Sequence, residues 1–287
     1  MLFYKNDIIN LSKYVSNLNY LDIGSRGEIN GWFKIIKNKL DIIKFDHDEN
    51  KILYDKQGIK KFYLTENPKQ SSLFKPKKND ITTELDKTRL NYRTIDVKVN
   101  TLDNEILDYK KQIDIIKIDT QGSEYEILKG GMERIKKDMP FLFLETWSEE
   151  YYEEITLFEE IIFEMRKIGY ELYSLDYASE KTVDLKHIFK KNIGGSKLTG
   201  LNLFLGPSLK YLMNEKDIER KIKMSFILFI HNLISFSYKR LENDNNEFKK
   251  QLKKNIEKRI KFKFFYDLMK IFNYITRYKI FENHKLT

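Results

Sequence analysis

Short apolar runs rich in β-branched and aromatic residues recur along the first two thirds of the chain, and stretches with helical spacing separate several of them. Strands that alternate with helices of about 10–15 residues indicate βαβ units, and hence a mainly parallel sheet with helices on both faces. We therefore predict a doubly wound α/β domain with a Rossmann-like sheet. The predicted strands are 20–24, 41–45, 61–64, 95–99, 113–119, 141–145, 170–175 and 201–205, and the clearest helical patterns are 123–137 and 154–168.

The pattern changes after Gly206 and Pro207, where long Lys-rich stretches with helical periodicity replace the strand signals. We therefore expect one α/β domain over 1–208 and a basic helical extension over 209–287. The whole chain carries a formal charge of +9, and the extension alone holds 19 Lys/Arg against 9 Asp/Glu, a difference of +10. The excess of positive charge thus belongs to the extension, and the α/β domain is close to neutral.

The chain contains no cysteine, which excludes disulfides, thiolate metal sites and a cysteine nucleophile. Its first residues lack the apolar segment and the cleavage site of a secretory signal, so the expected location is the cytoplasm. No metal site is expected, because His187, His231 and His284 show no spacing typical of metal ligands.

The first motif that suggests chemistry is Leu21–Gly27, LDIGSRG, at the end of a predicted strand and before a helix. Glycines there allow a tight turn and a close approach of the backbone to a ligand, and the Asp22 carboxylate can hold a cation or a hydrogen-bond donor. The glycine pattern of a dinucleotide site is broken by Arg26 and Ile29, which argues against a pyrophosphate cradle. The alternative is an ordinary corner between a strand and a helix.

Asp46 ends the second predicted strand, 24 residues after Asp22, as a βαβ unit requires. A carboxylate at this edge of a parallel sheet can accept hydrogen bonds from both ribose hydroxyls of an adenosine cofactor. The alternative is a surface acid that caps the next helix.

The third motif runs from Asp114 to Gly131, and it places a lysine inside an apolar strand. Side chains two apart in a strand point to the same side, so Lys117 and Asp119 face together, and a buried lysine is costly unless it is paired or functional. Asp119 would lie beside Asp22 and Gly24 if their two strands are adjacent. A purely structural Lys–Asp pair is the alternative.

This third motif, DIIKIDTQGSEYEILKGG, closely resembles the signature of the FkbM methyltransferase family. Five further segments match the family's motifs in the right order, and together the six span about residues 20–205. The resemblance implies a Rossmann-like methyltransferase fold, S-adenosylmethionine as the methyl donor, and O-methylation, often of a sugar. The five segments are LDIGSRGEINGWF, FDHDEN, QSSLF, VKVNTLD and FLFLE.

Two departures from the family pattern affect the expected cofactor site. Asp46 and His47 replace the usual Glu-Pro, which preserves a carboxylate on a shorter side chain, and Ser25 stands where alanine is common. Neither change removes a group that the cofactor needs. The residues expected to bind S-adenosylmethionine are Asp22, Gly24, Ser25, Gly27, Asp46 and His47.

Methyl transfer to a hydroxyl needs in-line alignment, and a base near the hydroxyl helps because an alcohol that keeps its proton is a poor nucleophile. The candidate bases are Asp119, Glu145, Glu124 and His47, and we favour Asp119 because its strand neighbours the cofactor strand. Lys117 would orient Asp119 or the acceptor, and Asp119, Lys117 and Glu145 form the expected catalytic group. The residues expected to contact the acceptor are Ser71, Ser72, Gln121 and Glu124.

The basic extension suggests an alternative, a nucleic-acid-binding protein or an RNA methyltransferase. Its charge is spread along amphipathic stretches without the interleaved aromatics of a single-strand binder, so nucleic acid is not the expected partner. Residues 224–238 contain no charged side chain, and a buried helix is the first expectation for them. The expected partner is a carbohydrate or glycan acceptor. For the extension, helical packing or contact with a second copy through the C-terminal helices ranks above the alternative, in which 222–281 docks on the inner face of a membrane.

Overall fold

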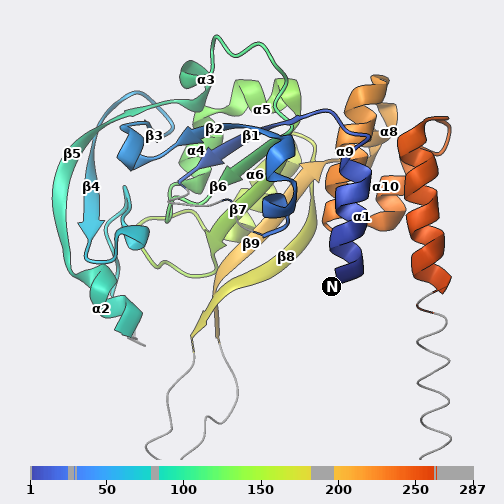
Figure 1. Ribbon diagram of the computed structural model, residues 1–287. Helices are drawn as coiled ribbons and strands as arrows, with labels where there is room; N and C mark the ends of the chain where they lie inside the picture. Colours follow the sequence, from blue (N-terminus) through green and yellow to red (C-terminus); the bar gives the residue numbers. More distant parts are fainter. Residues whose placement is uncertain are drawn as a thin grey trace, which may run out of the picture. The chain divides into compact units, whose positions relative to one another are not determined.

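The structure is a computed structural model that describes residues 2–24, 29, 31–78, 84–181, 197–261 and 263. The chain divides into two compact units (Figure 1). The larger unit comprises residues 17–215, and the smaller one combines residues 1–16 with residues 216–287. The sequence places a boundary near 208; the division by contacts lies at 215 and assigns the N-terminal helix to the smaller unit.

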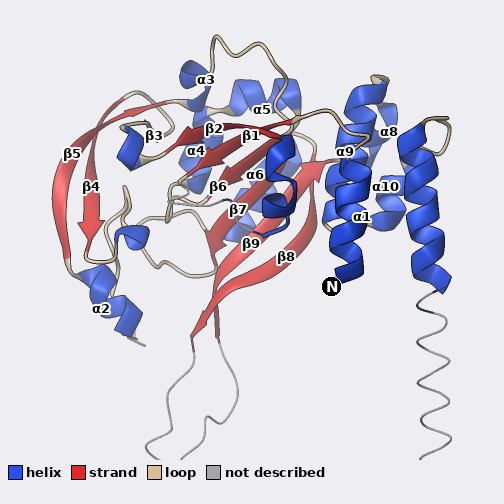
Figure 2. Ribbon diagram, viewed as in Figure 1, coloured by secondary structure: helices blue, strands red, loops and turns tan. Residues whose placement is uncertain are grey.

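A six-stranded sheet forms the centre of the larger unit, and its strand order is β2-β1-β6-β7-β9-β8 (Figure 2). The first four strands in this order are parallel to one another, while β9 is antiparallel to both β7 and β8. The mainly parallel α/β sheet predicted from the sequence is therefore confirmed. The strands are β1 (Leu18–Ile23), β2 (Leu40–Phe45), β6 (Ile115–Ile118), β7 (Phe141–Trp147), β8 (Tyr170–Lys181) and β9 (Lys197–Pro207).

The register of the sheet brings the first and third sequence motifs together. Asp22 on β1 lies opposite Lys117 on β6, and the backbone N–H of Asp119 donates to the carbonyl of Ile23 at 3.0 Å. The adjacency of these two strands, on which the expected site depends, is thus present. Asp119, directly after β6, also lies next in register to Glu145 on β7, because Ile118 pairs with Leu144.

Helices cover both faces of the sheet. On one face, Ile127 of α4 (Glu124–Gly130), Ile135 of α5 (Met132–Asp138) and Ile161 of α6 (Phe158–Lys167) join the aliphatic core formed by alternate residues of the strands. On the other face, Phe33 of the 3-10 helix η1 (Gly31–Lys39) packs edge-on against Phe143. The helix predicted over 123–137 is two helices, because the backbone turns at Gly131.

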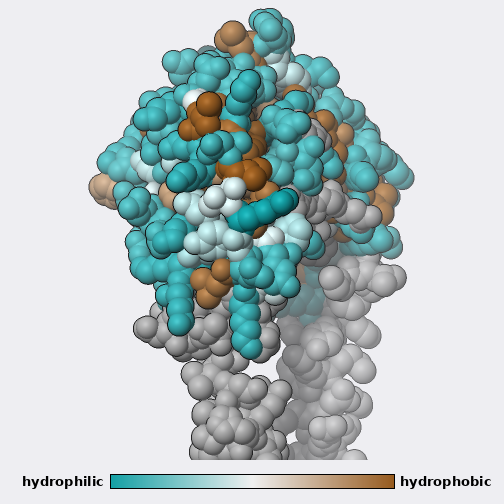
Figure 3. All heavy atoms as spheres, turned by 90° about the vertical axis from the view of Figure 1, so that its left-hand side faces the viewer, coloured by the Kyte–Doolittle hydropathy of each residue, from teal (hydrophilic) through white to brown (hydrophobic). Residues whose placement is uncertain are grey.

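A second sheet of three strands, in the order β3-β5-β4, adjoins the carboxyl end of β2 in the chain. Its strands are β3 (Ile52–Leu53), β4 (Gly58–Thr65) and β5 (Tyr92–Asn100), and the sequence predicts the last two but not the two-residue β3. The face of the molecule with β4 and β5 is mostly hydrophilic, with hydrophobic side chains gathered near its upper middle (Figure 3). The shorter elements of this unit are η2 (His47–Glu49), η3 (Pro68–Gln70), α2 (Glu84–Leu90), α3 (Leu102–Glu105) and α8 (Leu209–Asn214).

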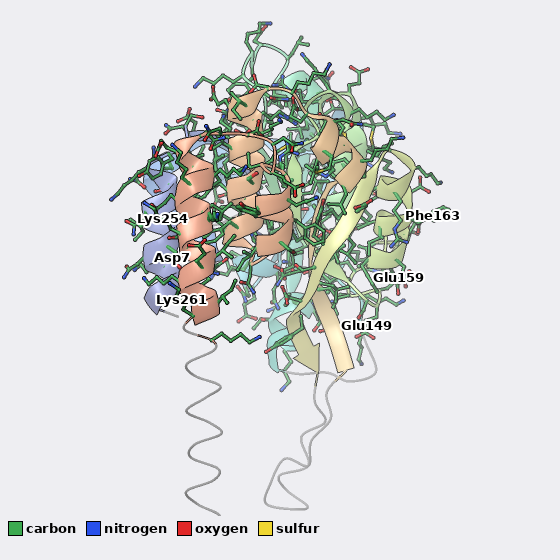
Figure 4. The ribbon with its side chains drawn as sticks, turned by 90° about the vertical axis from the view of Figure 1, so that its right-hand side faces the viewer. Asp7, Glu149, Glu159, Phe163, Lys254 and Lys261 are labelled. Carbon is green, nitrogen blue, oxygen red and sulfur yellow. The ribbon has the colours of Figure 1, made fainter. Side chains whose placement is uncertain are left out.

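The smaller unit is helical and joins two ends of the chain. Helix α1 (Leu2–Ser12) packs with α9 (Ile218–Ile230) and with the helical residues 247–261, and α9 packs with α10 (Ile234–Lys239). Arg259 stacks over the rings of Tyr4 and Phe229 and donates to Asp7 at 3.2 Å, which ties the two ends together. Figure 4 labels Asp7 on α1 and Lys254 and Lys261 on the helix beside it.

The uncharged stretch 224–238 forms parts of two helices in this unit. The side chains from Met224 to Ile230 are all buried, as the sequence predicts for this part of the stretch, so they are covered by the unit itself. Among the residues that the structure describes, no helix is both long and apolar enough to cross a membrane. Of the segment 222–281, for which membrane contact is an alternative in the sequence analysis, residues 262 and 264–281 lie outside the described residues.

Candidate active site

A cavity of about 310 Å³ lies at the carboxyl ends of β1, β2, β6 and β7. In open parallel sheets this edge is where ligands bind, because the connections to the helices leave a crevice there. The floor comes from the ends of the strands, and one wall comes from β3, β4 and η3. The polar residues that line the cavity are Asp46, His47, Lys51, Lys69, Ser71, Lys117, Asp119, Thr120, Gln121, Ser123 and Glu145.

Lys117 connects two carboxylates at the centre of this edge. Its Nζ donates to Asp119 Oδ2 at 3.2 Å and lies 3.9 Å from Asp22 Oδ1. Asp22 is 1% exposed, while the side chains of Lys117 and Asp119 are 20% and 25% exposed toward the cavity. The lysine inside the strand is therefore paired, and Asp22 supports it from below the surface of the cavity.

Glu145 completes a second acidic pair with Asp119. Burial, followed by the negative charges of Asp119 and Glu124 and a hydrogen bond with the Asp119 side chain, raises the pKa of Glu145 to about 8. Two adjacent carboxyl groups in one site share a proton because both cannot be charged at low cost. At neutral pH Glu145 is thus the protonated member of the pair, and Asp119 is the member that accepts the Lys117 ammonium.

The turn after β6 is held by buried hydrogen bonds. Glu124 accepts the backbone N–H groups of Thr120 at 2.9 Å and Gly122 at 3.0 Å, and burial raises its pKa to about 7. Gln121 has a φ of +62° and Gly122 a φ of +115°, so the turn uses the left-handed region twice. A Cβ on Gly24 would lie 2.2 Å from the carbonyl oxygen of Asp119, which shows why a glycine is needed where β1 ends.

Asp46 and His47 follow β2 and line the cavity. Asp46 is half-buried and accepts the backbone N–H of Asp48 at 3.2 Å, so it caps the short helix η2 while it also lines the cavity. The imidazole of His47 stacks on Phe62 of β4, with 4.8 Å between ring centroids and 2° between ring planes. This stack joins the edge of the main sheet to the wall of the cavity.

The paired serines differ in their positions. Ser71 lines the cavity, and its Oγ accepts the backbone N–H of Thr65 at 3.1 Å. Ser72 is fully buried and donates to the carbonyl of Gln121 at 2.7 Å. Ser71 can therefore reach a ligand, while Ser72 holds the turn that carries Gln121.

The structure thus gathers eight of the residues expected from the sequence around one cavity, namely Gly24, Asp46, His47, Ser71, Lys117, Asp119, Gln121 and Glu145. Asp22, Ser72 and Glu124 lie behind this lining and contact its residues. Ser25 and Gly27, together with His187 and His284, lie outside the described residues.

Several residues of the site have no signal in the predicted motifs. Phe62 and Lys69 line the cavity from β4 and η3, elements whose position beside the main sheet cannot be read from the strand pattern. Tyr152 lies in the loop after β7, and its hydroxyl is 3.1 Å from Gln121 Oε1. The signal that could have found it is local: the aromatic run from Trp147 to Tyr152 follows the strand that carries Glu145.

A mainly parallel sheet with helices on both faces and a polar crevice at the carboxyl ends of its strands, where Asp46 follows β2 and Asp119 follows β6, is typical of the Rossmann-like class of α/β enzymes. Within that class the chain matches the family model described as methyltransferase FkbM domain, over residues 37–172. The chain therefore contains a segment that matches the FkbM methyltransferase domain, and this match supports methyltransferase activity. The match includes Asp46, Asp119 and Glu145, while Asp22 precedes it. A comparison with curated proteins gave no match.

Proposed function

We propose that the protein transfers a methyl group from S-adenosylmethionine to a hydroxyl of a sugar, a glycan or a similar polar metabolite. The observation that carries this proposal is Asp119, which accepts the Lys117 ammonium, beside the protonated Glu145, at the edge of the sheet and in the lining of the cavity. A hydroxyl needs a proton acceptor of this kind, and the family supplies the methyl-transfer chemistry.

The residues at the carboxyl edge fit S-adenosylmethionine. A carboxylate after β2, at Asp46, is half-buried in the lining and can accept ribose hydroxyls. The stacked rings of His47 and Phe62 offer an aromatic surface beside it. When bound, S-adenosylmethionine would supply a methyl carbon on a positively charged sulfur. The carboxyl groups of Asp22, Asp46 and Asp119 provide a negative field that suits this charge.

The chain's own part in the reaction is to place the acceptor and to take its proton. Asp119 is held by Lys117 on Oδ2 and by Gln121 on Oδ1, at 3.2 Å each, so its orientation is fixed before a ligand binds. A hydroxyl bound against Asp119 would donate its hydrogen bond to the carboxylate and lose the proton as the oxygen is methylated. Ser71 and Gln121 lie in the same lining and can bind further acceptor hydroxyls.

Calorimetric titration tests the cofactor. Wild-type protein should bind S-adenosylmethionine and not nicotinamide dinucleotide, and Asp46→Ala should weaken binding by roughly tenfold or more, since two hydrogen bonds to a carboxylate are lost. Asp48→Ala is the matched control, because Asp48 is exposed and absent from the lining. Equal affinities of wild type and Asp46→Ala, or tighter binding of the dinucleotide, would refute the assignment.

Asp119→Asn tests the base. Asparagine keeps the shape and loses the proton acceptor, so turnover should fall by about 10²–10⁴-fold while the affinity for S-adenosylmethionine changes little. Methyl transfer to a panel of sugars and sugar derivatives, followed by mass spectrometry, measures both the rate and the acceptor class. Unchanged turnover would remove Asp119 from this role.

A further inference from the structure

We propose that Tyr152 is a positioning residue: its hydroxyl orients the side-chain amide of Gln121 so that Gln121 donates to Asp119, which fixes the proton of the acidic pair on Glu145. The inference rests on the proposed role of Asp119 as the base. It adds a residue from a separate loop to the site, and it gives Gln121 a role in setting the charge of Asp119.

Tyr152 is rigidly placed. Its side chain is fully buried, and its ring meets Trp147 edge-on at 5.9 Å between centroids. The guanidinium of Arg89 lies 5.6 Å from the centroid of the same ring and 4.0 Å from that of Tyr151. A backbone bridge between Pro76 and Tyr152 adds a further constraint. The phenol oxygen therefore occupies a fixed point beside the turn after β6.

Gln121 is fixed at its backbone as well as at its side chain. Its φ of +62° is left-handed, and its carbonyl accepts the hydroxyl of buried Ser72 at 2.7 Å. Its Oε1 lies 3.1 Å from the Tyr152 hydroxyl, and its Nε2 donates to Asp119 Oδ1 at 3.2 Å. The amide thus bridges the phenol and the carboxylate.

The direction of the bridge follows from hydrogen-bond chemistry. A side-chain amide has an accepting end and a donating end, and a carboxylate accepts only. When the phenol donates to Oε1, the NH₂ group must face Asp119. Without the phenol proton the amide can rotate and present its oxygen to Asp119, or leave the carboxylate. The Gln70 carbonyl, 2.9 Å from the same hydroxyl, competes for this proton.

Charged groups from every neighbouring element surround the pair. Lys117 lies on β6, the strand that ends before Asp119, and Asp22 lies on the neighbouring strand β1. Glu124 lies on α4. The charged or titratable residues that line the rest of the cavity are Asp46, His47, Lys51 and Lys69. Lys117 is the cation in contact with Asp119, and the buried Glu124 adds negative charge near Glu145. With Lys117 and Gln121 both donating to Asp119, the proton is retained by Glu145.

The two ionisation steps of the pair should therefore respond differently to Tyr152→Phe. Loss of the first proton leaves the pair with one negative charge, which the Gln121 amide stabilises, so this step should move up by about one pH unit, a tenfold change, when the amide is released. Loss of the second proton, from Glu145, does not change the charge that faces the amide, so this step should stay unchanged. A merely structural loss does not move one step alone.

Carboxyl carbon NMR of the ligand-free protein, with ¹³C-labelled Asp and Glu, measures both steps. The variants are Tyr152→Phe, Gln121→Met and their double mutant, and Tyr170→Phe is the matched control. Tyr170 is buried and its hydroxyl donates to the Pro140 carbonyl at 2.9 Å, away from the cavity. We expect the first step to rise in both single mutants, no additional rise in the double mutant, and no change in Tyr170→Phe.

An unchanged first step in Tyr152→Phe, or an additive second rise in the double mutant, would overturn the inference. If Tyr152→Phe does not fold, Gln121→Met carries the test, because it removes the amide and keeps the backbone. These titrations need no turnover, so they separate this inference from the proposed function. With an acceptor in hand, the acid limb of the pH–rate profile should shift by the same amount and its alkaline limb should not.

Discussion

Three glycine-to-alanine substitutions separate the cost of a left-handed backbone from the cost of a clash at the cavity. Gly24 has a φ of +81°, and an added Cβ would lie 2.2 Å from the Asp119 carbonyl oxygen and 2.6 Å from Thr120 Cγ2. Gly31 has a φ of +63° with nothing within 4 Å, and Gly58 has open space and no positive φ. The three sites therefore differ by one physical cause at a time.

The magnitudes follow from these differences. A left-handed alanine costs about 1–2 kcal/mol, and the lower entropy of the unfolded chain returns about 0.4–1 kcal/mol. Gly31→Ala should thus lower the free energy of unfolding by about 1 kcal/mol, and Gly58→Ala should change it by about 0.5 kcal/mol or less. At Gly24 the neighbour is backbone and cannot rotate away, so overpacking adds about 1–3 kcal/mol and the total is roughly 3 kcal/mol.

Urea unfolding followed by circular dichroism gives the three values, and titration with S-adenosylmethionine reports on the cavity. Gly24→Ala should also weaken the cofactor, since either the turn after β1 or the turn after β6 must move. If Gly24→Ala costs no more than Gly31→Ala, the close approach of these two turns is wrong.

Glu145→Gln should make the free energy of unfolding less dependent on pH. In the wild type the pKa of Glu145 rises from 4.5 to about 8 on folding, so between pH 4.5 and pH 8 the native state binds a proton that the unfolded state does not. Wild-type stability therefore falls as the pH increases through this range. Urea midpoints at pH 5 and pH 8 check this, and parallel profiles of the two proteins would contradict it. Arg134→Met should lower the free energy of unfolding by about 3 kcal/mol, because the buried Asp138 carboxylate would lose its partner. The Asp138 side chain is 4% exposed, and its Oδ2 lies 2.6 Å from Arg134 Nε. An unchanged urea midpoint would show that the pair contributes nothing. Ile227→Ala should cost about 2–5 kcal/mol by opening a cavity in the smaller unit, and thermal unfolding should show the loss; a cost below about 1 kcal/mol would argue that this residue is not in a packed core.

The sequence predicts the strands well and their grouping poorly. Periodicity identifies runs such as Ile115–Ile118, but it does not say that β4 and β5 leave the main sheet and form a sheet of their own. Strand β3 has only two residues, too few for any periodic signal. The long helical pattern is interrupted at Gly131, between α4 and α5. A glycine is needed there because an added Cβ would lie 2.7 Å from the Leu102 side chain, and the sequence does not show that these two segments meet.

The candidate site, like the fold, can be predicted only in part from the sequence. Lys117 and Asp119 could be placed together because the period of a strand fixes which side chains share a face. Ser72 and Glu124 belong to the same motifs, but their hydrogen bonds to the turn after β6 keep them behind the cavity, and only the folded chain shows this. Tyr152 reaches the site from a loop without regular periodicity, so its only signal in the sequence is its place among the aromatic residues that follow the strand with Glu145.

The smaller unit has a consequence for how the chain is made. Helix α1 leaves the ribosome well before its partners Phe229 and Arg259, which follow more than 200 residues later. During synthesis the buried faces of Ile8 and Leu11 must stay uncovered or be covered by chaperones, while the α/β unit can already form between them. The contacts that close the helical unit can therefore form only on chains that have been synthesised at least as far as Arg259.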